Sequence, residues 1–183
     1  MNHLRLLSFA LVASLSLASL AAAAEPESSE PDGFRGATFG MSPKQVASVM
    51  PQVKEVSLRA PAAPAAGETP PPVFPLRQFV LSGQTVGALG PCNLYFNFFR
   101  DKLTKIDFYC PDKAKVEAQL TSQFGPARKE LGQNHMWGVE TLVLYSISLG
   151  SFSYTHRALN DSMQTEMIRL YAQPPAGAPA AAQ

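Results

Sequence analysis

The sequence has almost no excess of charge of either sign and few of the residues that carry out chemistry. Its 183 residues include 15 Lys and Arg against 14 Asp and Glu, with only 3 His and 2 Cys. A nucleic-acid-binding domain normally carries a basic excess, so this balance argues against nucleic acid as a partner. Neither a Gly-x-Ser-x-Gly motif nor a nucleotide-binding glycine motif is present, and we expect no cofactor.

Long hydrophobic runs are also missing, except at the N-terminus. Met1–Ala24 combines Arg5, an apolar stretch and four closing alanines, which is the pattern of a cleavable secretory signal. The stretch is short and interrupted by serines, so a transmembrane helix is the poorer interpretation. The sequence therefore predicts export to the periplasm or the extracellular medium. No cysteine near the expected cleavage point can carry a lipid, and no second run can span a bilayer, so we expect a soluble mature protein.

Composition divides the rest of the chain into one domain and three low-complexity stretches. We expect residues 25–32, which are acidic and polar, and residues 173–183, which are rich in Pro and Ala, to be disordered. Between them, residues 33–172 have a length and patterning that suit a single domain. Residues 60–75 are dense in Pro and Ala and predict a solvated loop inside that domain, with a proline-rich ligand segment as the alternative.

Two segments predict helices. Ser42 precedes a proline and is followed three residues later by Gln45, which forms a capping box for a helix that ends at Pro51. A second helix is expected over Asp112–Phe124, where apolar residues recur at every fourth position before a Gly-Pro stop.

The segment Pro91–Cys110 predicts a β-hairpin with a three-residue loop at residues 100–102. In that register Cys92 faces Cys110, Phe98 faces Thr104, and apolar and polar residues separate onto opposite faces. A slip of one residue would mix the faces and separate the thiols. We expect a Cys92–Cys110 disulfide, because an even number of cysteines in an exported protein favours pairing.

A second hairpin is expected around a two-residue turn at Gly150-Ser151, with Tyr145 opposite His156 and a solvated reverse face. Further strands are predicted at Leu76–Leu81, Gln84–Ala88 and Met167–Tyr171. Together these elements predict an α+β fold, an antiparallel sheet with two helices packed on one face. Their order, helix then strands and helix then strands, suggests a duplication.

Catalytic and metal-binding patterns are weak. His135 and His156 match no metal-ligand spacing, so we expect no metal site. We also expect no catalytic role. The alternative is an unrecognised hydrolase, in which Glu130, Glu140 or His135 would have to converge in one cleft.

The polar face of the first hairpin carries exposed aromatic residues among amides and a lysine. We call the surface formed by Tyr95, Asn97, Phe99, Lys105 and Tyr109 the tyrosine face. Tyrosine is enriched where proteins recognise partners, so this face is the candidate binding surface. The alternative is that a helix or the proline-rich loop covers it.

The stretch Gly40–Val46, which reads Gly-Met-Ser-Pro-Lys-Gln-Val, resembles the opening of the small outer-membrane-assembly lipoproteins of the SmpA/OmlA (BamE) kind. With Phe34–Gly36 and Phe39 it is also similar to exported bacterial domains that begin Phe-x-Gly and continue Phe-Gly-Met-Ser. The resemblance implies a small α+β module that binds other envelope proteins. The lipid-bearing cysteine of the assembly lipoproteins is missing here. Secreted β-lactamase-inhibitor proteins are similar in architecture.

The sequence therefore predicts a non-catalytic, exported module of the bacterial envelope that binds an envelope or secreted protein. The alternative is a binder of a small ligand or an envelope component through the tyrosine face, which a deep pocket beside the tyrosines would favour.

Overall fold

The computed structural model describes residues 30–58, 75–132 and 134–172. The predicted signal at residues 1–24 and the predicted C-terminal tail at residues 173–183 lie outside the described residues. Nearly all of the predicted loop at residues 60–75 lies outside them as well.

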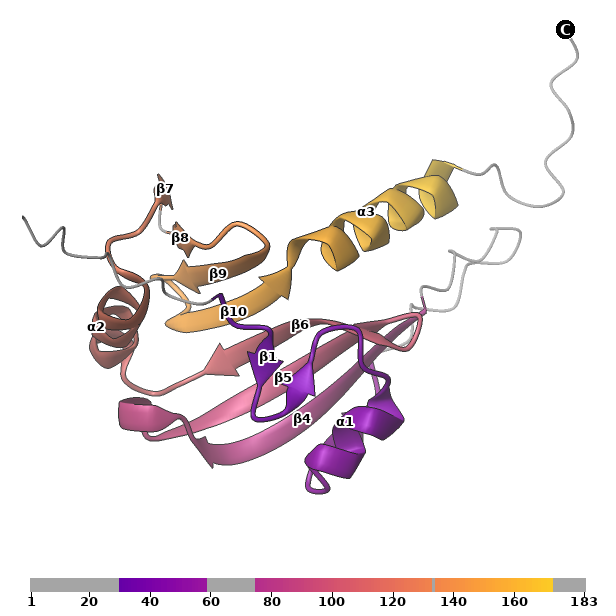
Figure 1. Cartoon of the computed structure of the whole chain (residues 1–183), viewed down its shortest axis with the longest axis horizontal. Coiled ribbons are helices and arrows are strands. Elements are labelled where there is room, and N and C mark those ends of the chain that lie inside the picture. The colour runs from indigo at the N-terminus through magenta and orange to yellow at the C-terminus, as the bar shows by residue number, and fades with distance from the viewer. Residues whose placement is uncertain (1–29, 59–74, 133, 173–183) are drawn as a thin grey trace, which may run out of the picture.

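An antiparallel sheet of eight strands forms the centre of the molecule, in the order β3-β4-β5-β6-β10-β9-β8-β7 (Figure 1). Its strands are β3 (Lys54–Val56), β4 (Leu76–Thr85), β5 (Pro91–Phe99), β6 (Lys102–Tyr109), β7 (Lys129–Leu131), β8 (Asn134–Trp137), β9 (Thr141–Ser146) and β10 (Ser151–His156). The other elements are the hairpin of β1 (Gly33–Phe34) and β2 (Ala37–Thr38), the 3-10 turn η1 (Gly87–Leu89), and the helices α1 (Pro43–Val49), α2 (Lys113–Phe124) and α3 (Arg157–Ala172). The predicted α+β class is confirmed.

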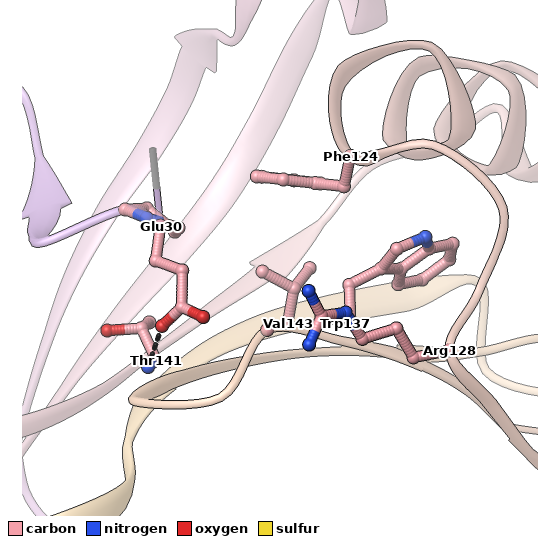
Figure 2. Close-up of a pocket in the computed structure, with 8 residues that line it drawn as sticks. Glu30, Phe124, Arg128, Trp137, Thr141 and Val143 are labelled. Atoms are coloured by element: carbon pink, nitrogen blue, oxygen red, sulfur yellow. Dashed lines mark hydrogen bonds between the residues drawn. The ribbon is translucent and has the colours of Figure 1, made fainter. Parts of the chain in front are cut away.

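One end of the described chain is tied to a distant turn. Glu30, which composition assigned to a disordered segment, is hydrogen-bonded to the turn between β8 and β9 (Figure 2). Residues 30–32 therefore have a defined position against the domain, and the prediction of disorder over residues 25–32 is wrong for its last part.

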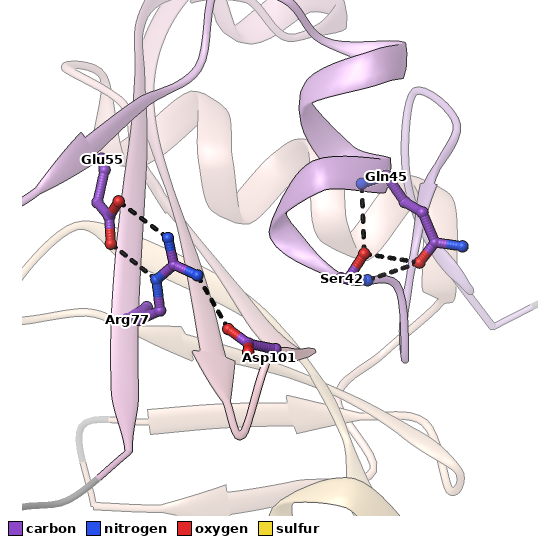
Figure 3. Close-up of polar contacts among 5 residues, drawn as sticks. All are labelled: Ser42, Gln45, Glu55, Arg77 and Asp101. Atoms are coloured by element: carbon purple, nitrogen blue, oxygen red, sulfur yellow. Dashed lines mark hydrogen bonds and ion pairs between the residues drawn. The ribbon is translucent and has the colours of Figure 1, made fainter.

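The two predicted helices pack on the same face of the sheet and are confirmed. Val46 of α1 and Val116 and Leu120 of α2 are fully buried and join one hydrophobic cluster with the central strands. Figure 3 shows the capping box at the start of α1, where the Ser42 amide donates to Gln45 Oε1 at 2.8 Å and the Gln45 amide donates to Ser42 Oγ. These bonds satisfy two amides that would otherwise lack partners at the helix start.

A third helix replaces the strand predicted at Met167–Tyr171. Its half-buried residues, including Leu159, Met163, Met167 and Leu170, recur every three or four positions, which is the period of a helix. The five residues Met167–Tyr171 resemble a strand when they are taken alone, because so short a segment does not show the helical period. In Figure 1, α3 lies on the side of β6 and β10 away from α1, and an Arg100–Glu166 ion pair of 2.6 Å ties it to the tip of the β5–β6 hairpin.

The β5–β6 hairpin has the predicted register over most of its length. Tyr95 pairs with Asp107 and Asn97 with Lys105, and the predicted Cys92–Cys110 disulfide is present. Closer to the tip the prediction is wrong, because Phe98 pairs with Leu103 and leaves Thr104 as an extra residue in β6.

The reason for this difference is the turn itself. Arg100 and Asp101 both have positive φ angles, of 47° and 56°, as a two-residue turn requires, so the loop is one residue shorter than expected. The bulge at Thr104 absorbs the displaced residue, and its hydroxyl donates to the Asn97 carbonyl at 3.2 Å. Arg77 holds the turn from β4, since it binds Asp101 at 2.9 Å and Glu55 at 2.7 Å (Figure 3).

The β9–β10 hairpin is present with a different turn. Ser146 pairs with Ser151 and Tyr145 with Phe152, and residues 147–150 connect the strands, so the predicted pairing of Tyr145 with His156 is wrong. The displacement is an even number of residues, so the core face is preserved. The predicted solvated reverse face is also wrong. Ser153 and Thr155 are 4% and 9% exposed, on a strand that has neighbours on both sides and that α3 contacts.

The two strands predicted at Leu76–Leu81 and Gln84–Ala88 form a single strand, β4, with a register shift between Leu81 and Gln84. The last residues of the second prediction belong to η1 instead. The positive φ of Gly83, 67°, lies within this irregularity, which shows why an alternating pattern broke there.

Candidate functional site

The centre of the tyrosine face is a pair of rings on neighbouring strands. Tyr95 on β5 and Tyr109 on β6 meet edge to face with ring centroids 5.3 Å apart. Tyr109 is 46% exposed and Tyr95 is half-buried. The sheet pleat sends both side chains to the face opposite the packed core, because alternate residues of a strand point to opposite sides.

The polar members of this face are hydrogen-bonded to one another. Asn97 donates to Asp107 Oδ2 at 2.8 Å and accepts from Gln78 at 2.8 Å. Lys105 pairs with the other oxygen of Asp107 at 2.7 Å. Gln78 and Asp107 are additions that the sequence reasoning did not assign to the site. The alternation of side chains along β4 and β6 could have placed both residues on this face of the sheet. The network fixes the amide and ammonium groups in place, so this part of the face is preorganised.

Phe99 does not belong to the exposed surface, and its predicted exposure is wrong. It is 7% exposed and lies at the hairpin tip, beside the Arg100 that pairs with Glu166 of α3. Figure 1 shows α3 running over this end of the sheet. The tyrosine face is therefore covered at the Phe99 end and open at the Tyr109 end.

Three exposed apolar residues lie on β9 and in the β9–β10 turn, next to the open Tyr109 end of the tyrosine face. Leu144 is on β9, and Ile147 and Leu149 are in the β9–β10 turn; they are 36%, 37% and 68% exposed. We call these three residues the apolar rim. Ser151 of β10 pairs with both Tyr109 and Ser146, which links the rim to the tyrosines through the sheet. The turn expected at Gly150-Ser151 would put Ile147 and Leu149 in a strand. In the structure the turn comprises residues 147–150, so both side chains lie in the turn instead.

The residues proposed for a hydrolase come from β7, β8 and the turn after β8. His135 Nδ1 lies 3.5 Å from Glu117 of α2, a residue that the sequence did not single out. Glu130 pairs with His135 through the β7–β8 ladder. Glu140 lies in the turn after β8 and lines a different cavity with His156, Arg157 and Asp161. Within the described ranges, no group of three or more His, Cys, Asp or Glu side chains could hold a metal ion.

A carboxylate-binding turn lies between β8 and β9 (Figure 2). The Glu30 carboxylate accepts hydrogen bonds from the amides of Val139, Glu140 and Thr141 at 2.5, 2.7 and 2.8 Å. Gly138 precedes them with a φ of 82°, and a Cβ there would lie 2.0 Å from the Thr141 carbonyl oxygen. Only glycine fits this position, because both the backbone angle and the space exclude a side chain.

The electrostatics of this turn favour the charged form of Glu30. Partial burial would by itself raise the pKa of this carboxyl, but the three backbone amides and the nearby Arg128 guanidinium outweigh it and lower the pKa. Arg128, Phe124 and Trp137 line the small adjoining cavity of about 60 Å³ (Figure 2). The Glu30 carboxylate is already hydrogen-bonded to the amides of this turn, so the turn is a structural contact between the start of the described chain and the sheet.

Comparison with protein-family models, with curated proteins and with solved structures found no match to this chain. No helix among the residues that the structure describes has both the length and the apolar character needed to cross a membrane. The surfaces of the molecule are therefore the guide to its function.

Proposed function

We propose that this protein is an exported, non-catalytic module that binds another protein of the bacterial envelope or a secreted protein. The observation that carries the proposal is the exposed Tyr95–Tyr109 pair beside the apolar rim. Aromatic residues on a rigid support supply large contact area at low cost in conformational entropy, and they dominate many protein interfaces.

The chemistry of the tyrosine face favours a protein partner over a small ligand. The polar side chains of this face, Asn97, Lys105 and Asp107, are already bonded to one another. They would therefore form the polar border of an interface rather than the main contacts to a ligand. The cavities beside Glu30, beside His156, between η1 and α2, and at the start of α1 are lined by residues other than Tyr95 and Tyr109. The expected partner presents an apolar patch that covers Tyr109 and the apolar rim, with polar groups around it.

Export is supported by two independent features. One is the signal-like pattern of residues 1–24, and the other is the Cys92–Cys110 disulfide, since such bonds persist in oxidising compartments. The partner is therefore expected in the same compartment.

Site-specific photocrosslinking tests the proposal. A photoreactive amino acid replaces Tyr109 in one variant and Val49 in a matched control, because Val49 is similarly exposed, at 44%, on α1 at the opposite face. We expect a discrete crosslinked partner at position 109 and none at 49, and loss of co-purification of that partner on Leu149→Asp. Equal crosslinking at both positions would contradict the proposal, as would turnover of a small substrate with no partner.

A further inference from the structure

A cavity lies on the core side of the sheet, on the opposite side from the tyrosine face. This cavity, of about 320 Å³, opens between the β1–β2 hairpin, η1 and α2. Phe152 and Tyr154 of β10 line it from the sheet, and Phe34 lines it from the hairpin. Its volume is at the lower end of the range of small-molecule sites.

Three aromatic residues that line this cavity, Phe34, Phe152 and Tyr154, pack against the fully buried ring of Phe108. Phe108 stacks on Phe152 with centroids 4.4 Å apart and an interplanar angle of 3°, and it contacts Tyr154 at 4.9 Å. Phe34 meets Phe108 edge to face at 5.3 Å. A planar ring entering from the open side would find aromatic surfaces arranged for further stacking, a geometry that adds to the effect of burial alone.

Tyr154 supplies an unused polar group in this apolar setting. The residue is 8% exposed, and its hydroxyl has no hydrogen-bond partner in the described part of the chain. No side-chain nitrogen or oxygen there is both sealed from solvent and unpaired. Tyr154 lines the cavity, so its hydroxyl is available there as a donor to a ligand. Burial raises the pKa of Tyr154 to about 12, so at neutral pH the group is a hydrogen-bond donor.

Arg35 holds a positive charge at the mouth of the same cavity. Its guanidinium donates to the Thr85 carbonyl at 2.6 Å and to Gln84 Oε1 at 3.3 Å, and it lies over the Phe34 ring at 5.2 Å. These contacts fix its position. A guanidinium has five N–H donors, so donors remain for another acceptor.

Two further amides line the cavity from α2. Gln119 and Gln123 are four residues apart and so lie on one face of the helix. Neither side chain has a hydrogen-bond partner in the part of the chain that the structure describes.

We propose that this cavity binds an aromatic carboxylate of one or two rings. The ring stacks against Phe152 and Tyr154, the Tyr154 hydroxyl donates to an oxygen of the ligand, and Arg35 pairs with the carboxylate. The glutamine amides add adaptable hydrogen bonds. This site is independent of the tyrosine face, so a protein partner and a small ligand could bind to the two faces of one domain.

Three probes separate the contributions to binding. The probes are 1-naphthoate, the neutral 1-naphthamide and the non-aromatic cyclohexanecarboxylate, titrated into the disulfide-bonded protein and followed by amide chemical shifts in NMR. We expect saturable shifts for 1-naphthoate at residues around Phe34, Gly87 and Gln119, weaker binding of the amide, and little binding of the non-aromatic acid.

Matched variants then assign the contacts. Tyr154→Phe removes only the hydroxyl and is expected to weaken 1-naphthoate binding about tenfold, whereas Tyr95→Phe on the other face should leave it unchanged. Arg35→Gln should weaken 1-naphthoate about tenfold but 1-naphthamide far less, and Arg100→Gln serves as its control. The proposal is overturned if no probe binds saturably, if the shifts surround Tyr109 instead, or if Tyr154→Phe and Tyr95→Phe bind alike.

Discussion

The Glu30 carboxylate accepts a hydrogen bond of 2.8 Å from the amide of Thr141, which lies 111 residues further along the chain. Together with the amides of Val139 and Glu140, this contact ties the start of the described chain to the turn between β8 and β9. A contact of this kind joins two segments that are distant in the sequence, so its loss should affect stability as well as local order.

Glu30→Gln is expected to destabilise the domain at neutral pH by about 1–2 kcal/mol, because hydrogen bonds to a charged acceptor become bonds to a neutral one. Urea unfolding at pH 7 measures the change. Glu140→Gln is the control, since Glu140 contributes only its backbone amide to this contact. Equal effects of the two substitutions would contradict the assignment.

The same contact should depend on pH in a defined direction. The folded-state pKa of Glu30 is lowered, so its stabilisation is present above the unfolded-state pKa, near the ordinary 4.5, and is lost as the pH falls through the folded-state value. The difference in unfolding free energy between the wild type and Glu30→Gln should therefore be largest at pH 6–7 and shrink below pH 4.5. A difference that grows on acidification would refute this account.

Gly138→Ala should be more harmful than Gly83→Ala, although both glycines have positive φ. The methyl group at position 138 would lie 2.0 Å from the Thr141 carbonyl, while nothing lies within 4 Å at position 83. We expect about 1 kcal/mol of backbone strain at position 83 and clearly more at position 138. Thermal unfolding of the two variants makes the comparison.

Removal of the Cys92–Cys110 disulfide should cost about 3 kcal/mol in the chain-entropy model. The double substitution Cys92→Ser with Cys110→Ser, compared with the wild type in guanidinium, measures the cost. Non-reducing mass spectrometry should show the oxidised mass for the exported protein. Two thiols that alkylate freely without reductant would argue against the bond.

Helix α3 should open before the rest of the domain. None of its residues is fully buried, whereas Val116 and Leu120 of α2 are. Segments with few buried apolar contacts exchange their amides through local opening. Hydrogen exchange should therefore label residues 157–172 faster than residues 113–124, and Arg100→Gln should accelerate α3 further, because it removes the ion pair with Glu166. Equal protection of both helices would be the contrary result.

The tyrosine face could be predicted from local sequence in part. A period of two and the cysteine pair define the register of the β5–β6 hairpin, and this register predicts that Tyr95 and Tyr109 share one face. Phe99 obeys the same period yet is buried, at the hairpin tip where the Arg100 guanidinium lies over its ring and pairs with Glu166 of α3. Glu166 lies 66 residues beyond Arg100 in the chain, so no local pattern shows this contact.

Local sequence patterns were sufficient to predict the α+β class, the helices α1 and α2, the disulfide and most of the β5–β6 register. Each of these depends on caps, periods and spacings between near neighbours, which any short window contains. The turn of the β9–β10 hairpin, the position of α3, the docking of Glu30 and the cavity beside Phe34 became clear only from the folded chain. These features depend on contacts between distant residues, whose energies no local pattern encodes.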